Sequence, residues 1–292
     1  MSRYCSCIRS LLLLGVVLSM SAPQASETPQ ATSLLGQPLY AAPADQATLN
    51  KQAYALIWYG RRTAYTGDYQ GAIEIFSAGV DKFPNDARMY RHRGHRYIST
   101  RQFELAIADL EHAVSLIEGS ENQIEPDGLP NAQGIPVSTL HGNIWYHLGL
   151  AYYLKHDWEN ARRAYQMGYD ISTNDDNRVS TAHWLYMIHR RMGDKAGAER
   201  AVAEITTDMN VIENHAYHRL CLFYKGVLAM DEVAEDDADN PGNAAIAYGL
   251  ANWANYSADQ AEATARLNAL LATDSWAAFG YIAAEADVAA EF

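Results

Sequence analysis

Residues 145–165 read WYHLGLAYYLKHDWENARRAY, and their spacing predicts two antiparallel helices joined by a short turn. Gly149 is followed twelve residues later by Ala161 and sixteen residues later by Tyr165. Small residues at facing positions let two helices approach closely, while the aromatic ring fills the space beside them. One such pair leaves an apolar face uncovered, so further copies are expected along the chain.

The same spacing recurs in four other places. Gly60 and Gly94, the first residues of two of these sets, are separated by 34 residues. A period of this length, built from helix pairs, is typical of a solenoid in which each unit packs on its neighbours. The four sets are Gly60, Ala72 and Phe76; Gly94, Ala106 and Leu110; Tyr186, Ala198 and Val202; and, more weakly, Gly249, Ala261 and Ala265.

These residues resemble the tetratricopeptide repeat (TPR) family, whose pattern is Trp-x2-Leu-Gly-x2-Tyr followed by Ala-x3-Phe and a proline. The resemblance covers residues 50–205 and, loosely, 240–275. It implies an all-α, right-handed TPR-like superhelical solenoid of antiparallel helix pairs. Residues 215–292 look like the ends of secreted bacterial TPR proteins without a known activity, so this part implies no function. The third unit carries the pattern at Trp145, Leu148, Gly149, Tyr152, Ala161 and Tyr165.

Residues 1–25 are typical of a secretory signal peptide. Arg3 and Arg9 precede an apolar run at 11–18, and small residues follow it. The run is shorter than the roughly 20 residues of a membrane-spanning helix, although an uncleaved anchor stays open. We therefore expect an exported protein, periplasmic or extracellular, with no stable membrane insertion after signal cleavage. The candidate cleavage sites follow Ala22, Ala25 and Ser26.

The rest of the chain divides by composition. Residues 26–50 are a lead-in segment, 51–230 the solenoid, 231–242 an acidic linker, and 243–292 a degenerate helix pair followed by a capping helix. A long loop at 119–140 contains three prolines and three glycines. We expect this loop to be ordered at the rim of a groove, although a disordered loop stays open. The apolar residues expected to pack it are Ile124, Leu129, Ile135 and Leu140.

Charge and cysteine content exclude some classes of protein. The chain has 22 basic and 35 acidic residues, and this acidic balance argues against a nucleic-acid partner. The basic residues gather early, with nine Lys or Arg against four acids at 51–101. Once a signal peptide is removed, Cys221 is the only cysteine, which excludes a disulfide within the chain and favours a buried, inert thiol.

The concave face is the predicted binding surface, because the first helix of each pair lines it in the family that the chain resembles. Its basic and aromatic lining favours a protein or peptide partner, possibly acidic in character, or a small anionic ligand. Alternatively, these side chains are solvated or pair with acids on neighbouring repeats. The Lys and Asn set with which chaperone-binding family members grip a carboxylate is not reproduced. The predicted contacts are Arg61, Arg91, His95, Tyr146, His147, His183 and Arg190.

The sequence carries no enzyme motif and only weak metal-ligand spacings. The sequence has no nucleophile elbow, phosphate-binding glycine loop, dinucleotide fingerprint or zinc-protease helix. His92 with His95, and His215 with His218, have the spacing of metal ligands, but arginines flank the first pair. We therefore expect no cofactor, no metal and no catalysis. Two alternatives to the binding scaffold stay open, a small-molecule or lipid carrier closed by the 119–140 loop and a metal-dependent enzyme.

Overall fold

The computed structural model describes residues 31–32, 36–39, 45–126, 131–234 and 241–290. The predicted signal peptide with its cleavage sites lies outside these residues, and so do Leu129 and residues 235–240 of the predicted linker. The chain divides into two units, Met1–Gln52 and Ala53–Phe292. In the first unit, strands β1 (Ala31–Thr32) and β2 (Pro38–Leu39) form a minimal antiparallel pair. Among the described residues, no helix is both long and apolar enough to cross a membrane.

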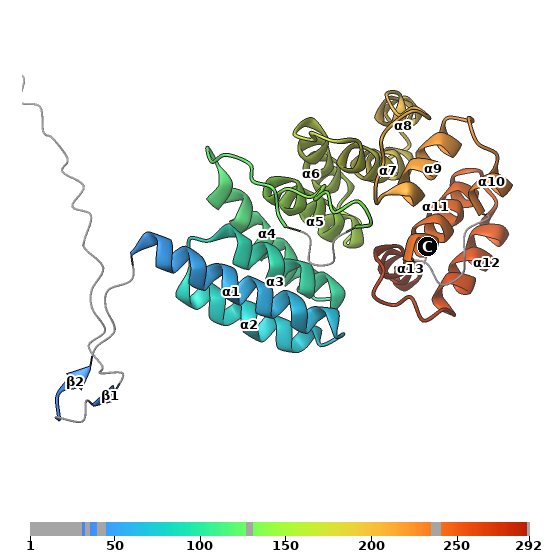
Figure 1. The fold of residues 1–292 in the computed structure, drawn as a ribbon. Coiled ribbons are helices and arrows are strands. Elements are labelled where there is room, and N and C mark those ends of the chain that lie inside the picture. Colours follow the sequence, from blue (N-terminus) through green and yellow to red (C-terminus); the bar gives the residue numbers. More distant parts are fainter. Residues whose placement is uncertain (1–30, 33–35, 40–44, 127–130, 235–240, 291–292) are drawn as a thin grey trace, which may run out of the picture. The chain divides into compact units, whose positions relative to one another are not determined.

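Antiparallel helix pairs build the second unit, and the predicted all-α solenoid is confirmed (Figure 1). Four successive pairs match the first four predicted sets, and a fifth pair follows two shorter helices. The helices are α1 (Gln46–Tyr65), α2 (Tyr69–Lys82), α3 (Ala87–Ser99), α4 (Phe103–Ile117), α5 (Leu140–Leu154), α6 (Trp158–Asp170), α7 (Asp175–Arg191), α8 (Lys195–Val202), α9 (His215–Tyr224), α10 (Met230–Ala234), α11 (Pro241–Tyr256), α12 (Gln260–Leu271) and α13 (Phe279–Ala289).

Aspartate caps begin the second helix of most pairs. Asp68 accepts a hydrogen bond from the backbone N–H of Gly71 at 2.8 Å, and Asp194 does the same for Gly197 at 2.8 Å. Each cap satisfies one of the backbone donors that a helix start leaves free, which stabilises the helix by about 1 kcal/mol. Asp157 and Asp259 cap α6 and α12 in the same way.

The predicted small-residue contacts join the paired helices. A Cβ atom built on Gly60 would lie 2.6 Å from the ring of Phe76, and one on Gly149 would lie 2.6 Å from the ring of Tyr165. Real Cβ atoms do not approach other atoms so closely, so each glycine exists to admit the large side chain sixteen residues later. Gly94 makes the same room for Leu110, at 2.8 Å.

The fifth predicted set is wrong by two residues. Ala261 and Ala265 are exposed on α12, whereas Ala251, Ala263 and Leu267 are buried at the same spacing. Gly249 faces a different helix, since a Cβ on it would lie 2.8 Å from Leu220 of α9. A glycine indicates that another helix packs closely, but not which one. Because α11 packs against both α9 and α12, the sequence did not show that Gly249 faces α9.

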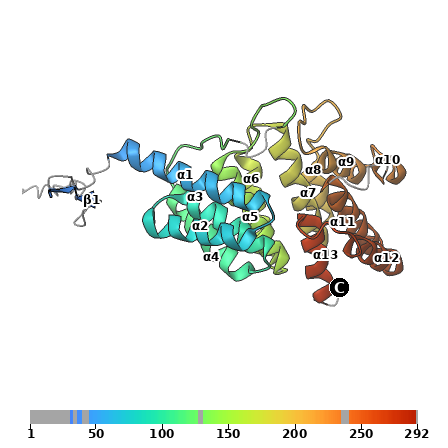
Figure 2. The ribbon, with the colours of Figure 1, turned by 60° about the horizontal axis from the view of Figure 1, so that its bottom comes forward.

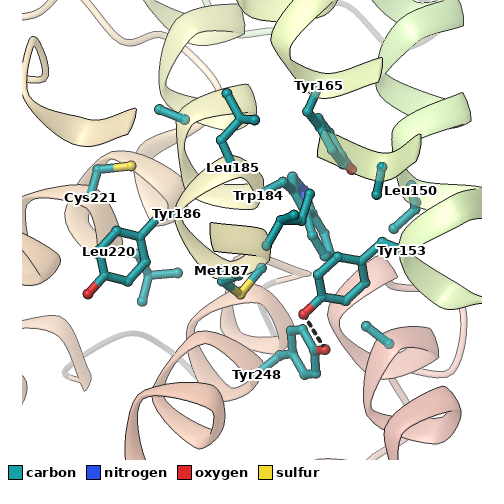
Figure 3. Close-up of a cluster of buried hydrophobic side chains, with 14 of the residues drawn as sticks. Leu150, Tyr153, Tyr165, Trp184, Leu185, Tyr186, Met187, Leu220, Cys221 and Tyr248 are labelled. Atoms are coloured by element: carbon teal, nitrogen blue, oxygen red, sulfur yellow. Dashed lines mark hydrogen bonds between the residues drawn. The ribbon is translucent and has the colours of Figure 1, made fainter. Parts of the chain in front are cut away.

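The core is centred on α7, which is buried along most of its length. Figure 3 shows Trp184 of α7 lying between Tyr165 and Tyr153, with Tyr248 of α11 beyond them. The hydroxyl groups of Tyr153 and Tyr248 are 2.8 Å apart, so this buried polar contact is satisfied. Cys221 is fully buried at the edge of the same cluster, and burial raises the pKa of its thiol, as expected for an inert cysteine.

The last helix, α13, packs beside α11 (Figure 2) and also reaches α5. Asp287 of α13 is fully buried, and its carboxylate accepts a hydrogen bond from the hydroxyl of Tyr248 at 2.8 Å. The same carboxylate contacts the guanidinium of Arg191 on α7 and lies 3.0 Å from Nε2 of His156. A segment expected to cap the stack therefore contacts helices from the middle of the chain.

The long loop is held by hydrogen bonds at both of its described ends. The backbone N–H of Glu125 donates to the carbonyl of Ser138 at 3.0 Å, and the Asn174 side chain donates to the carbonyl of Val137 at 2.8 Å. The expectation that Ile124 and Ile135 pack this loop is wrong, since they are 66% and 50% exposed. Neighbouring residues of an extended segment point to opposite sides, so Glu125 is buried where Ile124 is not.

The predicted acidic linker, 231–242, is helical at both ends. Helix α10 covers its first residues, and α11 begins at Pro241, two residues before the predicted boundary. Proline fits the first turn of a helix because its missing N–H would have no partner there.

Candidate functional site

A cavity of about 350 Å³ lies within the second unit. The first helices of four pairs, α1, α3, α5 and α7, contribute to its wall. Residues 137–139 of the long loop line one side, as expected for a loop at the rim, and residues 213–214 line another. Phe279, the first residue of α13, completes the lining. The cavity is therefore assembled from segments far apart in the sequence.

Five of the seven predicted contacts line this cavity, and they come from three helices, α1, α3 and α5. They are Arg61, Arg91, His95, Tyr146 and His147.

The other two predicted contacts, His183 and Arg190, do not line it. His183 is fully buried beside the ring of Tyr224, and burial lowers its pKa to about 3. The guanidinium of Arg190 lies 4.7 Å from the ring centre of Tyr256 and donates to the hydroxyl of Tyr186 at 2.8 Å. Because later helices cover α7 on several sides, helical spacing alone did not show which side faces the cavity.

Arg91 is buried against a carboxylate that the long loop supplies. Its guanidinium lies 2.8 Å from a carboxylate oxygen of Glu125, and the side-chain amide of Asn143 donates to the same carboxylate. Burial lowers the pKa of Arg91, although Glu125 acts against that shift. Nε of Arg91 has no hydrogen-bond partner among the described residues. The loop thus neutralises one of the arginines on the cavity wall.

Arg96 and Arg61 have no carboxylate partner within 4 Å among the described residues. The Arg96 guanidinium lies 5.0 Å from the ring centre of Tyr69, and it donates no hydrogen bond to a described residue. Burial lowers the pKa of Arg96 to about 10, and the positive charges of Arg91 and Arg61 act in the same direction. Arg61 donates to the backbone carbonyl of Pro126 at 2.7 Å. This end of the cavity therefore carries an excess of positive charge.

The histidines of the cavity serve as neutral aromatic groups. The rings of His95 and His147 have centroids 4.2 Å apart, and Nδ1 of His147 lies 2.6 Å from the carbonyl oxygen of Asn143. A carbonyl can only accept, so Nδ1 of His147 carries the proton and Nε2 is left as an acceptor. Burial lowers the pKa of His92, His95 and His147 well below 6.5, with the nearby arginines adding to the shift.

Two tyrosines provide a free hydroxyl hydrogen. The indole N–H of Trp184 donates to the hydroxyl of Tyr146 at 2.9 Å, and that hydroxyl is 3.1 Å from the hydroxyl of Tyr217. The two hydroxyls share a single hydrogen bond, so one of their two hydrogens has no acceptor among the described residues. Both tyrosines line the cavity, which therefore has a hydroxyl donor in addition to the guanidinium donors.

Sequence reasoning missed several groups that complete the cavity. Arg96 belongs to the same basic run as Arg91 and follows it by five residues on the same helix. This was the only sequence feature that connected Arg96 with the predicted binding surface. Tyr217 and Phe279 come from two helices outside the first four units, where no local pattern connects them with α3. Glu125 does not line the cavity itself but pairs with Arg91, which does, and it comes from the long loop.

No group of three or more His, Cys, Asp or Glu side chains among the described residues could hold a metal ion. Nδ1 of His92 lies 2.8 Å from a guanidinium nitrogen of Arg91, while Nε2 of His218 lies 2.7 Å from the carbonyl oxygen of Thr206. Asp176 accepts hydrogen bonds from three backbone N–H groups at 212–214, so it holds that segment in place.

These observations describe an all-α solenoid of TPR-like helix pairs that encloses a basic cavity lined with aromatic side chains. No protein-family model matches the chain, and no curated protein matches it. Among solved structures, it is similar to kinesin light chain-like, nearly identical TPR-like repeats from Podosopora anserina, in two forms. Their TM-scores are 0.46 and 0.45, with 14% identity, covering 76% of this chain and 93% and 94% of those chains.

Another similar structure is YrrB, described as a TPR protein with an unusual peptide-binding site. It has a TM-score of 0.40 and 15% identity, and the match covers 78% of this chain and 95% of that chain. Likenesses at this level concern the fold, which the helix pairing of this chain establishes on its own contacts.

Proposed function

We propose that this chain is an exported binding protein, without catalytic activity, that takes acidic groups of a polypeptide partner into the cavity on its concave face. The observation that carries the proposal is the unequal charge of the cavity. Arg61, Arg91 and Arg96 line it, and only Arg91 has a carboxylate partner among the described residues, Glu125. Export is supported by the signal-peptide pattern at 1–25.

The chemistry of the lining suits an acidic partner. Guanidinium groups bind carboxylates through charge-assisted hydrogen bonds, which are about twice as strong as neutral ones. The neutral rings of His95 and Phe279 offer apolar contact beside these donors. A residue that presents an acidic head on an apolar stem would meet both kinds of group.

A small anionic molecule is the second candidate ligand. The long loop and α13 both contribute to the lining, and a cavity of about 350 Å³ has the size of a small-molecule site. The lining is basic rather than apolar, which disfavours the lipid carrier that the sequence left open.

The test measures binding of a fluorescein-labelled hexaglutamate peptide to the full chain by fluorescence anisotropy, with hexaglutamine as the neutral control. Arg61→Gln combined with Arg96→Gln should weaken binding at least tenfold, because neither residue pairs with a carboxylate of the described chain. Arg62→Gln is the matched control, since Arg62 is exposed on the same helix and does not line the cavity.

The salt dependence of the same binding provides a second measure. Affinity for hexaglutamate should fall as NaCl rises from 50 to 300 mM, while melting temperature stays nearly constant. Equal binding of hexaglutamine, or equal loss in the Arg62→Gln and double variants, would rule out the basic cavity as the binding site.

A further inference from the structure

At one end of the cavity, the arginine side chains outnumber their carboxylate partners among the described residues by two. We call this end, formed by Arg61, Arg91 and Arg96, the arginine pole. Glu125 lies 2.8 Å from Arg91 and compensates one guanidinium, whereas no described carboxylate lies within 4 Å of the other two. Glu213 also lines the cavity, but its carboxylate lies within 4 Å of none of these guanidiniums and accepts a hydrogen bond from the side chain of Asn131 in the long loop.

The three guanidiniums of the arginine pole repel one another. Arg91 and Arg61 both lower the pKa of Arg96, and Arg61 lowers the pKa of Arg91. Like charges gathered in a partly buried site destabilise the free protein unless an anion joins them. Met89 of α3 is buried against Ala53 and Ile57 of α1, and this contact fixes the two helices that carry the arginines.

Several hydrogen-bond donors of the arginine pole also have no partner among the described residues. Arg96 has five N–H donors and gives none of them to a described residue. Nε of Arg91 has no partner among the described residues. Elsewhere on the lining, the Tyr146 and Tyr217 pair has one hydroxyl hydrogen without an acceptor among the described residues. The cavity thus offers many donors, with the charge concentrated at one end.

From this balance we propose that the arginine pole is a subsite for a tetrahedral, doubly charged oxyanion, of the kind carried by a phosphate monoester. A single carboxylate would compensate only one of the two guanidiniums that have no carboxylate partner among the described residues, whereas a phosphate monoester near neutral pH carries a charge close to −2 on three acceptor oxygens. Arginine pairs with phosphate through two parallel hydrogen bonds, which suits the free donor groups of Arg96. The inference rests on the proposed function and specifies the chemistry of the group that the cavity binds.

The cavity volume of about 350 Å³ leaves room for the rest of a small ligand or for one phosphorylated side chain. Aromatic groups lie along the remaining lining, since Phe279 is 5.7 Å from His147 and 6.2 Å from Tyr146, measured between ring centres. Both sources of the phosphate, a free monoester and a phosphorylated peptide, present the same group to the arginine pole.

The experiment titrates the full chain with inorganic phosphate, with phenyl phosphate and with benzoate at pH 7.5, following heat by calorimetry. Phenyl phosphate should bind at least tenfold more tightly than benzoate, which has the same ring and a single charge. Arg96→Gln should remove this preference, and Arg62→Gln should leave it unchanged. A preference that survives both Arg96→Gln and Arg61→Gln would overturn the assignment to the arginine pole.

Peptides separate the two sources and distinguish failure of the inference from failure of the proposed function. A phosphoserine peptide that binds more tightly than phenyl phosphate, and more tightly than its glutamate counterpart, supports a phosphate on a polypeptide. Binding of phenyl phosphate without either peptide supports a free monoester and contradicts the polypeptide partner. Binding of hexaglutamate with no response to any phosphate overturns the inference while the proposed function stands. Melting curves of each variant verify that it is folded.

Discussion

The ring of Phe279, at the start of α13, lies with its centre 5.4 Å from the imidazole of His95 on α3. The last helix of the chain therefore contacts the second helix pair of the solenoid. Nearby, Nε of Arg101 donates to Glu285 at 2.7 Å, and the ring of Trp276 lies 5.5 Å from that of Tyr69. These contacts bring the end of the chain onto the cavity that the early repeats build.

Asp287→Asn should strongly destabilise the protein. The fully buried carboxylate joins Arg191, His156 and Tyr248, so removing its charge leaves a buried guanidinium with a weaker partner. Breaking a buried pair of this kind costs about 3–5 kcal/mol. Urea denaturation followed by circular dichroism measures the loss. The matched control is Glu285→Gln on the same helix, whose more exposed ion pair with Arg101 should contribute less than about 1 kcal/mol. Equal losses in the two variants would contradict this account.

Gly149→Ala should destabilise the protein, although the same change in an exposed helix stabilises by about 1 kcal/mol. The added Cβ would lie 2.6 Å from the ring of Tyr165, and overpacking of this kind costs about 1–3 kcal/mol. The test compares Gly149→Ala in the natural chain with Gly149→Ala in a Tyr165→Ala background. In the second background the alanine should be neutral or stabilising, because the ring that it meets is gone. A stabilising effect in both would show that the close contact is absent.

Acidification should destabilise the protein from about pH 6.5 downward. Burial lowers the pKa of His92, His95 and His147 well below 6.5, and that of His183 to about 3. Below pH 6.5 the unfolded chain binds protons that the folded chain does not, so the free energy of unfolding falls with pH. Each histidine contributes at most about 1.4 kcal/mol per pH unit.

Urea denaturation at pH 7.5, 6.5 and 5.5 measures this dependence. Above pH 6.5 these histidines are neutral in both the folded and the unfolded state, so their contribution to the pH dependence of the unfolding free energy should vanish there. His183→Gln should reduce the slope below pH 6.5 whatever its effect on overall stability, because one proton-binding difference is removed. An unchanged slope in this variant would show that His183 titrates normally in the folded protein.

Glu125→Gln should separate stability from binding. The substitution leaves Arg91 buried without its carboxylate, which should cost about 3 kcal/mol or more. It also adds one unit of positive charge to the arginine pole, so affinity for phenyl phosphate should rise severalfold in the protein that remains folded. Calorimetric titration at low temperature measures the affinity, and Glu121→Gln in the exposed part of the same loop is the control. A fall in affinity would mean that Glu125 does more to shape the cavity than to balance its charge.

The helix pairs could be predicted because their signals are local. Ala72 and Phe76 stand at fixed distances from Gly60, since all three meet within one helical hairpin. Aspartates at the turns mark the helix starts for the same reason, as Asp68 does for α2. The prediction for the fifth pair was wrong by two residues because Gly249 packs against Leu220, which lies outside its own hairpin.

The sequence by itself determined the repeated helix pairs, the excess of basic residues in the early repeats and five of the residues that line the cavity. Periodicity fixes these features, because a residue and its partner lie within one or two helical turns or one hairpin of each other. Only the tertiary structure decided that Glu125 neutralises Arg91 and leaves Arg96 without a carboxylate partner among the described residues. It also decided that Phe279 closes the lining. Contacts between segments so distant in the chain depend on how all the helices pack together, and no local spacing of residues specifies that packing.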